Sequence, residues 1–137
     1  MSENDVTAIQ SMASPATPMA LRVAVTLGLP DRLRGDGATP AALAAELGVD
    51  ATALRLLLNH LTSLGFAECA PTGYRTTVSG HALCRDAAGA LANLLDLNSA
   101  GGHAELAFTE LLPTVTTGEP TGPWHAAAKP CTPTAGS

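Results

Sequence analysis

The stretch DATALRLLLNHLTSLGFAECAPTGYRTTVSGHAL, residues 50–83, limits the possible folds of this chain more than any other part. Its first half spaces leucines along one apolar helix face, and Asp50 stands where an N-cap residue is expected. Gly65 predicts the end of that helix. The runs FAECA and YRTTV flank a Pro-Thr-Gly turn and predict a β-hairpin. A helix followed directly by a hairpin is typical of a winged helix-turn-helix.

The segment just before this stretch supplies the first helix of the motif. Thr39 predicts an N-cap and Pro40 a first helical residue, while Gly48 predicts the helix end. Only a few residues separate this helix from the one that Asp50 begins. Two helices joined so closely are expected to form a helix-turn-helix.

Helices are also predicted before the motif. We expect a short one over residues 7–13 and a longer one that begins near Pro18 with Thr17 as its N-cap. The acidic start of the chain, residues 1–6, carries no helical pattern and is expected to be disordered.

After the hairpin, Ser79 predicts the cap of another helix. Further apolar helices are expected over residues 87–98 and 101–118. The Pro-, Gly- and Thr-rich tail, residues 119–137, has no hydrophobic period and is expected to be disordered. The prediction is therefore a mainly α fold, a winged helix-turn-helix with a small β-hairpin wing and flanking dimerisation helices, over residues 7–118.

Charge argues against nucleic acid as a partner, because the formal net charge is -5 and Lys plus Arg total only seven. The second helix of the motif offers Arg55 and Asn59 on its outer face, but Leu56 points the same way. The wing offers Arg75 together with Glu68. These are few basic side chains for a domain that binds DNA. We favour a solvated or protein-packed helix face, and a winged-helix transcription regulator stays open as an alternative.

The sequence shows no group of residues with the spacing of a catalytic or metal-binding motif. The three cysteines are odd in number and widely spaced, and no histidine has metal-ligand spacing. His103 with Glu105 and Glu110 is interpreted as a solvated polar face. We therefore expect no catalytic and no metal-binding residues. The N-terminus lacks the pattern of a signal peptide and no apolar run could span a bilayer, so a cytoplasmic protein without membrane contact is expected.

The run ALRLLLNHLTSLGFAE, followed by GYRTTVSGHAL, resembles the N-terminal domain of class I S-adenosylmethionine-dependent O-methyltransferases of the bacterial aromatic-polyketide (anthracycline) type. Tyr74, Thr77, Gly80 and Leu83 match that family's wing-to-helix pattern. PMALRVAVTLGLPDRL and AELAFTELLPTVTTGEP resemble its flanking helices. The resemblance covers roughly residues 10–120, and winged-helix regulators share its central pattern.

The resemblance implies a dimerisation domain whose helices intertwine with a second subunit and help wall the partner's substrate pocket. In that family S-adenosylmethionine (SAM) sits in a following Rossmann-like domain, on a glycine-rich turn after a strand. Here the glycine pairs at 35/37 and 101/102 follow no predicted strand. The change in composition after Pro120 is interpreted as a truncation, a shifted reading frame or a shortened gene. We expect no cofactor bound by this chain, and no methyl transfer by it alone.

Excess apolar helix surface outside a small winged-helix core predicts an interface. The candidate dimer-interface residues are Met12, Met19, Leu94, Leu97, Leu106 and Phe108. The expected function is a non-catalytic dimerisation and substrate-pocket domain of a truncated small-molecule O-methyltransferase of secondary metabolism, acting as a homodimer. The alternative is an auxiliary or small-molecule-binding partner of a separate methyltransferase subunit, with an aromatic polyketide as possible ligand.

Overall fold

The computed structural model describes residues 2–119 of the chain. Its elements, in chain order, are α1 (Glu3–Ala13), α2 (Ala16–Thr26), α3 (Leu29–Arg32), α4 (Pro40–Leu47), α5 (Ala51–Ser63), β1 (Ala67–Ala70), β2 (Gly73–Thr76), the 3-10 helix η1 (Ser79–Leu83), α6 (Ala92–Leu95), α7 (Ala100–Leu106), the 3-10 helix η2 (Ala107–Glu110) and α8 (Leu111–Thr117). The prediction of a mainly α fold with one small antiparallel hairpin is confirmed.

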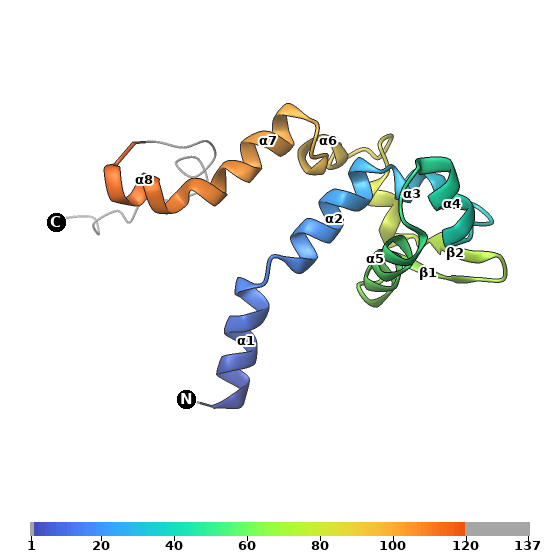
Figure 1. Ribbon diagram of the computed structural model, residues 1–137, viewed down its shortest axis with the longest axis horizontal. Helices are drawn as coiled ribbons and strands as arrows, with labels where there is room; N and C mark the ends of the chain where they lie inside the picture. The colour runs from blue at the N-terminus through green and yellow to red at the C-terminus, as the bar shows by residue number, and fades with distance from the viewer. Residues whose placement is uncertain (1, 120–137) are drawn as a thin grey trace, which may run out of the picture.

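Figure 1 shows three parts of unequal compactness. The body, residues 16–83, contains α2 to α5, the hairpin and η1. The N-terminal arm is α1, which projects from the start of α2. The C-terminal arm, residues 100–117, contains α7, η2 and α8, and runs away from the body past α6. Both arms therefore carry helix surface that the body does not cover.

The two helices of the helix-turn-helix begin where their capping residues predict. The Thr39 hydroxyl accepts a hydrogen bond from the Ala42 N–H at 3.1 Å, and the Asp50 carboxylate accepts from the Ala53 N–H at 2.8 Å. Each bond satisfies a backbone donor that the first helical turn leaves free. Gly48 ends α4 in the left-handed conformation, with φ 69°.

The core lies where α2 to α5 meet the hairpin. Leu54, Leu58 and Leu61 are 3% exposed or less, which confirms the inner stripe of α5. They pack with buried residues of the neighbouring elements, chiefly Ala24, Leu29, Leu33, Leu43, Ala44 and Ala67. Burial of these apolar side chains is the main stabilising contribution to the body.

The hairpin pairs β1 with β2 in antiparallel register, Ala67 opposite Thr76 and Ala70 opposite Gly73. A third segment joins it, because Ala38 and Tyr74 exchange two backbone hydrogen bonds of 2.9 Å. The wing is thus anchored to the loop that precedes α4 and does not stand free.

The N-terminal helices start earlier than the sequence predicts. α1 begins at Glu3, so residues 3–6, which are expected to be disordered, are helical. The reason is a capping box, in which the Ser2 hydroxyl accepts from the Asp5 N–H and the Asp5 carboxylate accepts from the Ser2 N–H. Thr17 does not cap α2 but lies inside it, where its hydroxyl shares a 3.1 Å hydrogen bond with His60.

The downstream helices are shorter than predicted. Ser79 opens a 3-10 turn rather than capping an α-helix, and the Thr77 hydroxyl accepts the Gly80 N–H instead. Within the predicted helix 87–98 only Ala92–Leu95 is α-helical, because Ala90 adopts a positive φ of 51° before it.

The predicted helix 101–118 is divided by η2. Pro113 lacks an N–H, and its ring crowds the carbonyl of Thr109 one turn before it, which accounts for the tighter turn there. The predicted disordered tail, residues 119–137, lies outside the described residues except for Glu119.

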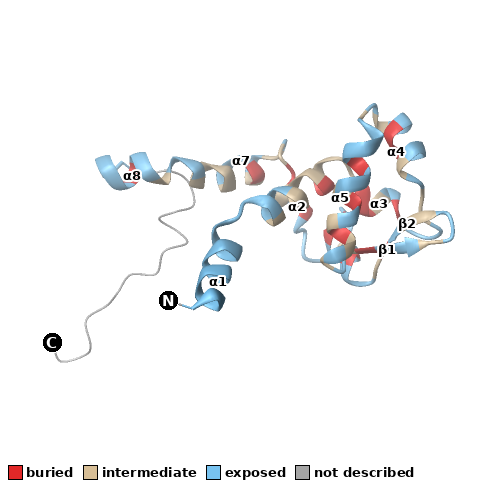
Figure 2. Ribbon diagram, turned by 60° about the horizontal axis from the view of Figure 1, so that its bottom comes forward, coloured by how far each residue is buried: buried red, intermediate tan, exposed pale blue. Residues whose placement is uncertain are grey.

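Figure 2 shows that burial is concentrated in the body. α1 has no buried residue at all, and α8 has only Thr114. No helix in the described part of the chain is long and apolar enough to cross a membrane. The body has a core of its own, whereas the arms leave most of their surface exposed.

Candidate dimerisation surface

Half of the large apolar side chains left exposed in the described residues, five of ten, lie on the two arms. On α1, Ile9 is 54% exposed and Met12 80% exposed, and on α8 Leu112 is 76% exposed. Val6 and Val115 are also exposed. Large exposed apolar side chains on helices are a general feature of protein interaction surfaces.

A groove of about 450 Å³ lies between the two arms. We call it the arm groove. Its walls come from the junction of α1 with α2 and from α7 and η2. The lining residues are Met12, Ala13, Ser14, Pro15, Pro18, Met19, Arg22, Glu105, Leu106, Phe108 and Thr109. Four of the six candidate interface residues therefore lie around one feature, although residues 12–19 and 106–108 are far apart in sequence.

The other two candidates lie outside the arm groove. Leu94 is 41% exposed on α6, and its carbonyl accepts a 3.1 Å hydrogen bond from the Arg22 guanidinium. Leu97 is half-buried, and its N–H donates to the Thr26 hydroxyl at 2.8 Å. Arg22 lines the arm groove, so its bond to Leu94 links that groove to α6. The role of all six residues in an interface stays a prediction.

A second groove, of about 350 Å³, runs along the outer face of α2 and α5. We call it the helix groove. It is lined by Ala16, Met19, Ala20, Val23, Leu27, Val49, Asp50, Ala53, Leu54 and Leu57. Asp50 is the one charged residue in this lining, and its carboxylate already caps α5. The groove is therefore apolar and offers no free polar group to orient a polar ligand.

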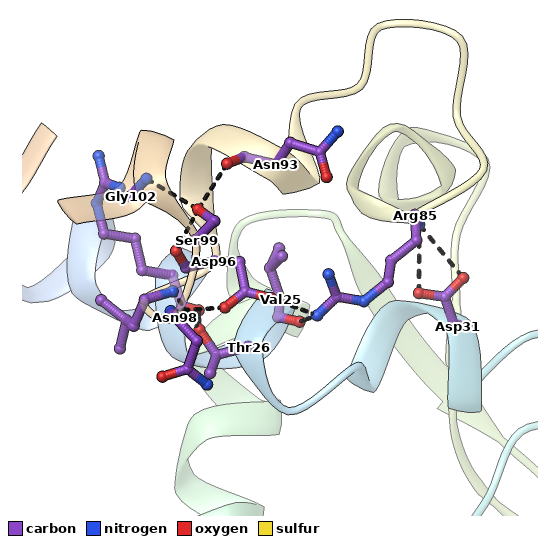
Figure 3. A network of polar contacts seen from close by, with 11 residues as sticks. Val25, Thr26, Asp31, Arg85, Asn93, Asp96, Asn98, Ser99 and Gly102 are labelled. Atoms are coloured by element: carbon purple, nitrogen blue, oxygen red, sulfur yellow. Dashed lines mark hydrogen bonds and ion pairs between the residues drawn. The ribbon is translucent and has the colours of Figure 1, made fainter. Parts of the chain in front are cut away.

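The C-terminal arm is tied to the body by a network of polar contacts (Figure 3). The Arg85 guanidinium donates to the Asp96 carboxylate at 2.7 Å and to the Val25 carbonyl at 3.0 Å. The Asp96 carboxylate also accepts the Asn98 N–H at 2.8 Å. These two donors hold the pKa of Asp96 below its ordinary value, the backbone N–H contributing most. We call this network the joint. Neither the types nor the spacing of these residues in the sequence predicts it.

Ser99 continues the network into the arm. Its hydroxyl donates to the Asn93 and Asp96 carbonyls and accepts the Gly102 N–H at 2.9 Å, which caps α7. The carboxylate of Asp96 and the hydroxyl of Ser99 thus set the direction in which α7 leaves the body.

Most cationic side chains on the described surface are already engaged. Arg75 pairs with Glu68 at 2.7 Å on the wing, and Arg34 pairs with Asp86 at 2.8 Å. Arg32 pairs with Glu46. Of the residues offered by α5, Asn59 accepts a hydrogen bond from the Tyr74 hydroxyl. This pattern supplies few free donors for base edges or phosphates.

Nothing in residues 2–119 gathers metal ligands. No group of three or more His, Cys, Asp or Glu side chains there is placed to hold a metal ion. Cys84 is fully buried, and burial raises the pKa of its thiol. A buried thiol of raised pKa is a packing residue rather than a nucleophile.

The glycines of this part of the chain do not fit a SAM-binding turn. The Cα positions of Gly101 and Gly102 face the Asn93 and Asp96 carbonyls inside the joint of the C-terminal arm, where a Cβ would overlap. Gly37 approaches the Tyr74 carbonyl in the same way. These glycines allow close backbone packing, and none follows a strand into a helix as a cofactor loop would.

Comparison with known proteins decides the family. Residues 9–86 match the model of the O-methyltransferase dimerisation domain. This chain belongs to that family. The match covers α2 to η1 and the last five residues of α1, and so includes the whole helix groove. The description of the family names dimerisation, a form of self-association, for this domain.

Two curated relatives come from Streptomyces. The 2,7-dihydroxy-5-methyl-1-naphthoate 7-O-methyltransferase of Streptomyces carzinostaticus is 38% identical over 116 residues, 84% of this chain and 35% of the relative. Aclacinomycin 10-hydroxylase RdmB of Streptomyces purpurascens is 40% identical over 115 residues, 82% of this chain and 31% of the relative. The chain thus spans about a third of the length of these relatives.

Solved structures agree with this assignment. The O-methyltransferase NcsB1 from neocarzinostatin biosynthesis, solved with S-adenosyl-L-homocysteine, superposes with a TM-score of 0.76 at 36% identity. The match covers 88% of this chain and 40% of NcsB1. TnmH superposes with the same TM-score at 27% identity, over 95% of this chain and 39% of TnmH.

The residues that carry the family resemblance hold the wing against the body. The Thr77 hydroxyl donates to the Gly65 carbonyl at 2.6 Å and accepts the Gly80 N–H at 3.0 Å. A Cβ on Gly80 would overlap the Phe66 carbonyl oxygen, so only glycine fits there. Leu83 is 4% exposed and packs with Val25 and Ala92.

Proposed function

We propose that this chain is a non-catalytic self-association module of a small-molecule O-methyltransferase-type protein of secondary metabolism, and that it acts as a homodimer. The observation that carries this proposal is the uncovered apolar surface of both arms, together with the arm groove between them. The family assignment supports it, because a dimerisation domain is defined by pairing with a second copy.

The energetics of association favour pairing through the arms. A stable protein interface buries about 1,600 Å² in total, and apolar area contributes about 25 cal/mol per Å². The large exposed apolar side chains of the body, Met19, Leu56 and Val78, lie on separate elements, whereas projecting helices can cross a partner's helices and bury one face each. In a two-fold dimer every such contact occurs twice.

The setting in aromatic secondary metabolism is supported by the names of the relatives. One is named for a dihydroxy-naphthoate and the other for aclacinomycin. One relative is a methyltransferase and the other a hydroxylase, so the same domain accompanies different reactions. We propose that residues 2–119 contribute no catalytic group, bind no SAM, and serve to pair and position whatever domain performs the chemistry.

A second candidate function uses the same surface. The aligned region makes up about a third of each relative, at 38–40% identity. A longer chain that carries this domain would therefore present a similar surface for pairing. In this proposal the chain is an auxiliary subunit of a separate methyltransferase. Co-expression with such a chain under two affinity tags distinguishes the candidates, since only the second gives mixed dimers in preference to homodimers.

The test of the homodimer is size-exclusion chromatography with multi-angle light scattering on the wild-type chain and two variants. Leu106→Asp places a charge in the arm groove, and Leu56→Asp places one on the outer face of α5, where Leu56 is 63% exposed. We expect a wild-type dimer whose dissociation constant rises at least about 30-fold in Leu106→Asp, the effect of one interface hot spot.

Leu56→Asp should remain dimeric, and circular dichroism should show that both variants keep their helices. A folded wild-type monomer over the whole accessible concentration range would overturn the proposal.

A further inference from the structure

We propose that the segment after α8 folds back on its own chain and places the indole ring of Trp124 in the arm groove, where it competes with a second copy of the chain. Trp124 lies beyond the described residues, which end at Glu119. The docking of the ring stands without the proposed homodimer, whereas the competition rests on it. Three features support the docking: the lining of the groove, the place where the described arm ends, and charge.

The lining of the arm groove offers the groups that an indole ring needs. Phe108 and Met19 present an aromatic ring and a thioether, and both kinds of group contact a further aromatic ring favourably. A buried indole also requires an acceptor for its N–H. The carboxylate of Glu105 and the hydroxyl of Thr109 belong to the same lining. At about 450 Å³ the groove lies within the size range of pockets that enclose a whole small molecule.

The described arm ends within reach of the groove. Gly118 ends α8 in the left-handed conformation, with φ 77°, which takes the chain off the helix axis. From Glu119 back to Phe108 the helical arm measures roughly 17 Å, at 1.5 Å per residue. Trp124 follows Glu119 by five residues, which is also roughly 17 Å of extended chain. The ring can therefore reach the groove of its own chain while α8 stays intact.

Charge favours the same placement. Glu105 is half-buried in the groove and forms no ion pair within residues 2–119. Residues 120–137 carry Lys129 and no acidic side chain. Lys129 follows Trp124 by five residues, so a ring beside Phe108 leaves the ammonium group within reach of Glu105, about one helical turn away. Opposite charges there attract and hold the segment along the groove.

Tethering favours this occupant in the free chain. A ring joined to the groove by a short linker has an effective concentration there of about millimolar, above that of a second copy in a dilute solution. A second copy that pairs through the arm groove must first displace the ring. Its apparent affinity is then reduced by the fraction of chains in which the groove is open.

The test uses the fluorescence of Trp124, which is the only tryptophan of the chain. Acrylamide quenching is measured on the full chain and on two variants, Leu106→Asp and Met19→Asp, which place a charge in the groove lining. The matched control is Leu56→Asp, on the outer face of α5, where Leu56 is 63% exposed. A peptide of residues 119–129 gives the value for a free ring. Light scattering reports the oligomeric state at each concentration, and circular dichroism reports the helices.

We expect acrylamide to quench the wild-type ring at least about threefold less than the peptide, because a ring docked in two-thirds of the chains is accessible in the remaining third. Both groove variants should approach the peptide, and Leu56→Asp should match the wild type. The protection should persist on dilution to the monomer. Quenching equal to that of the peptide overturns the docking. Protection that disappears on dilution belongs to a contact between copies and also overturns it.

Trp124→Ser tests the competition by light scattering. The same occupancy predicts that the dissociation constant of the dimer falls at least about threefold when the ring is removed. An unchanged dissociation constant overturns the competition. Monomers at every concentration in both proteins overturn the homodimer and the competition with it, while the quenching measurement still decides the docking.

Discussion

Arg85 and Asp96 form an ion pair of 2.7 Å that joins the segment after the wing to the root of the C-terminal arm. The Asp96 side chain is only 12% exposed, and the Arg85 guanidinium also reaches the Val25 carbonyl on α2. The carboxylate is shielded, although the Arg85 side chain is 47% exposed, and the pair connects three segments of the chain. The joint lies at the start of the arm that supplies one wall of the arm groove.

The first prediction concerns this joint. Asp96→Ala removes both the ion pair and the acceptor for the Asn98 N–H. We expect hydrogen exchange in α7 to become about tenfold faster or more, while α5 amides change little, because the arm can open without the core. Asp86→Ala is the control, since the Asp86 side chain is 66% exposed and surface pairs contribute little. Equal effects of the two variants would contradict this role for Asp96.

The second prediction is a pH dependence with a definite sign. The Asn98 N–H and Arg85 lower the pKa of Asp96, so the folded state binds this proton less readily than the unfolded chain. The stabilisation is complete above the ordinary Asp pKa of about 3.9 and is lost as pH falls from there through the lowered value. Thermal unfolding between pH 3 and pH 7 should show a steeper acid loss in the wild type than in Asp96→Ala. Parallel stability curves for the two proteins would contradict a stabilising role for the ionised Asp96.

The third prediction concerns the close approach at Gly80. Gly80→Ala would place a methyl group against the Phe66 carbonyl and the Thr76 side chain, and we expect a loss of about 1–3 kcal/mol in unfolding free energy. Gly89→Ala is the matched control, because a Cβ there meets nothing within 4 Å. Urea denaturation monitored by circular dichroism measures both. A Gly80→Ala variant as stable as wild type would show that the wing can shift to accommodate the methyl group.

The fourth prediction addresses DNA. With Arg32, Arg34 and Arg75 engaged in ion pairs and a formal net charge of -5, we expect no saturable binding to duplex DNA at protein concentrations below about 100 μM, the weak end of non-specific affinities. Fluorescence anisotropy of a labelled duplex at low salt is the measurement. Binding that weakens steeply with salt and disappears in Arg55→Ala would support the regulator alternative instead.

Much of the body could be predicted from the sequence because its signals are local. Thr39 and Asp50 cap helices through hydrogen bonds to residues three positions away, and the leucine spacing of α5 reports its buried face directly. The hairpin follows from a turn between two short runs. Such features depend on neighbours within one or two helical turns, which is the range that a sequence pattern covers.

The arms and the joint could not be predicted in the same way. The bond from Arg22 to Leu94 spans 72 residues, and that from Arg85 to Val25 spans 60. Neither residue type nor spacing indicates such partners. The left-handed Ala90 likewise interrupts a segment whose composition favours a helix. Apolar excess predicts the six candidate interface residues without indicating how they lie relative to one another, and four of them line one groove.

The absence of any buried residue in α1 has a thermodynamic consequence. An isolated helix of eleven residues is marginal in water, because nucleation costs more than so few backbone hydrogen bonds return. In the proposed homodimer its order would be linked to association by mass action, so the helical content of residues 3–13 would depend on protein concentration. On dilution this terminus should melt together with the dimer while the leucine core of the body persists, which makes the N-terminus of the chain an internal reporter of its own assembly.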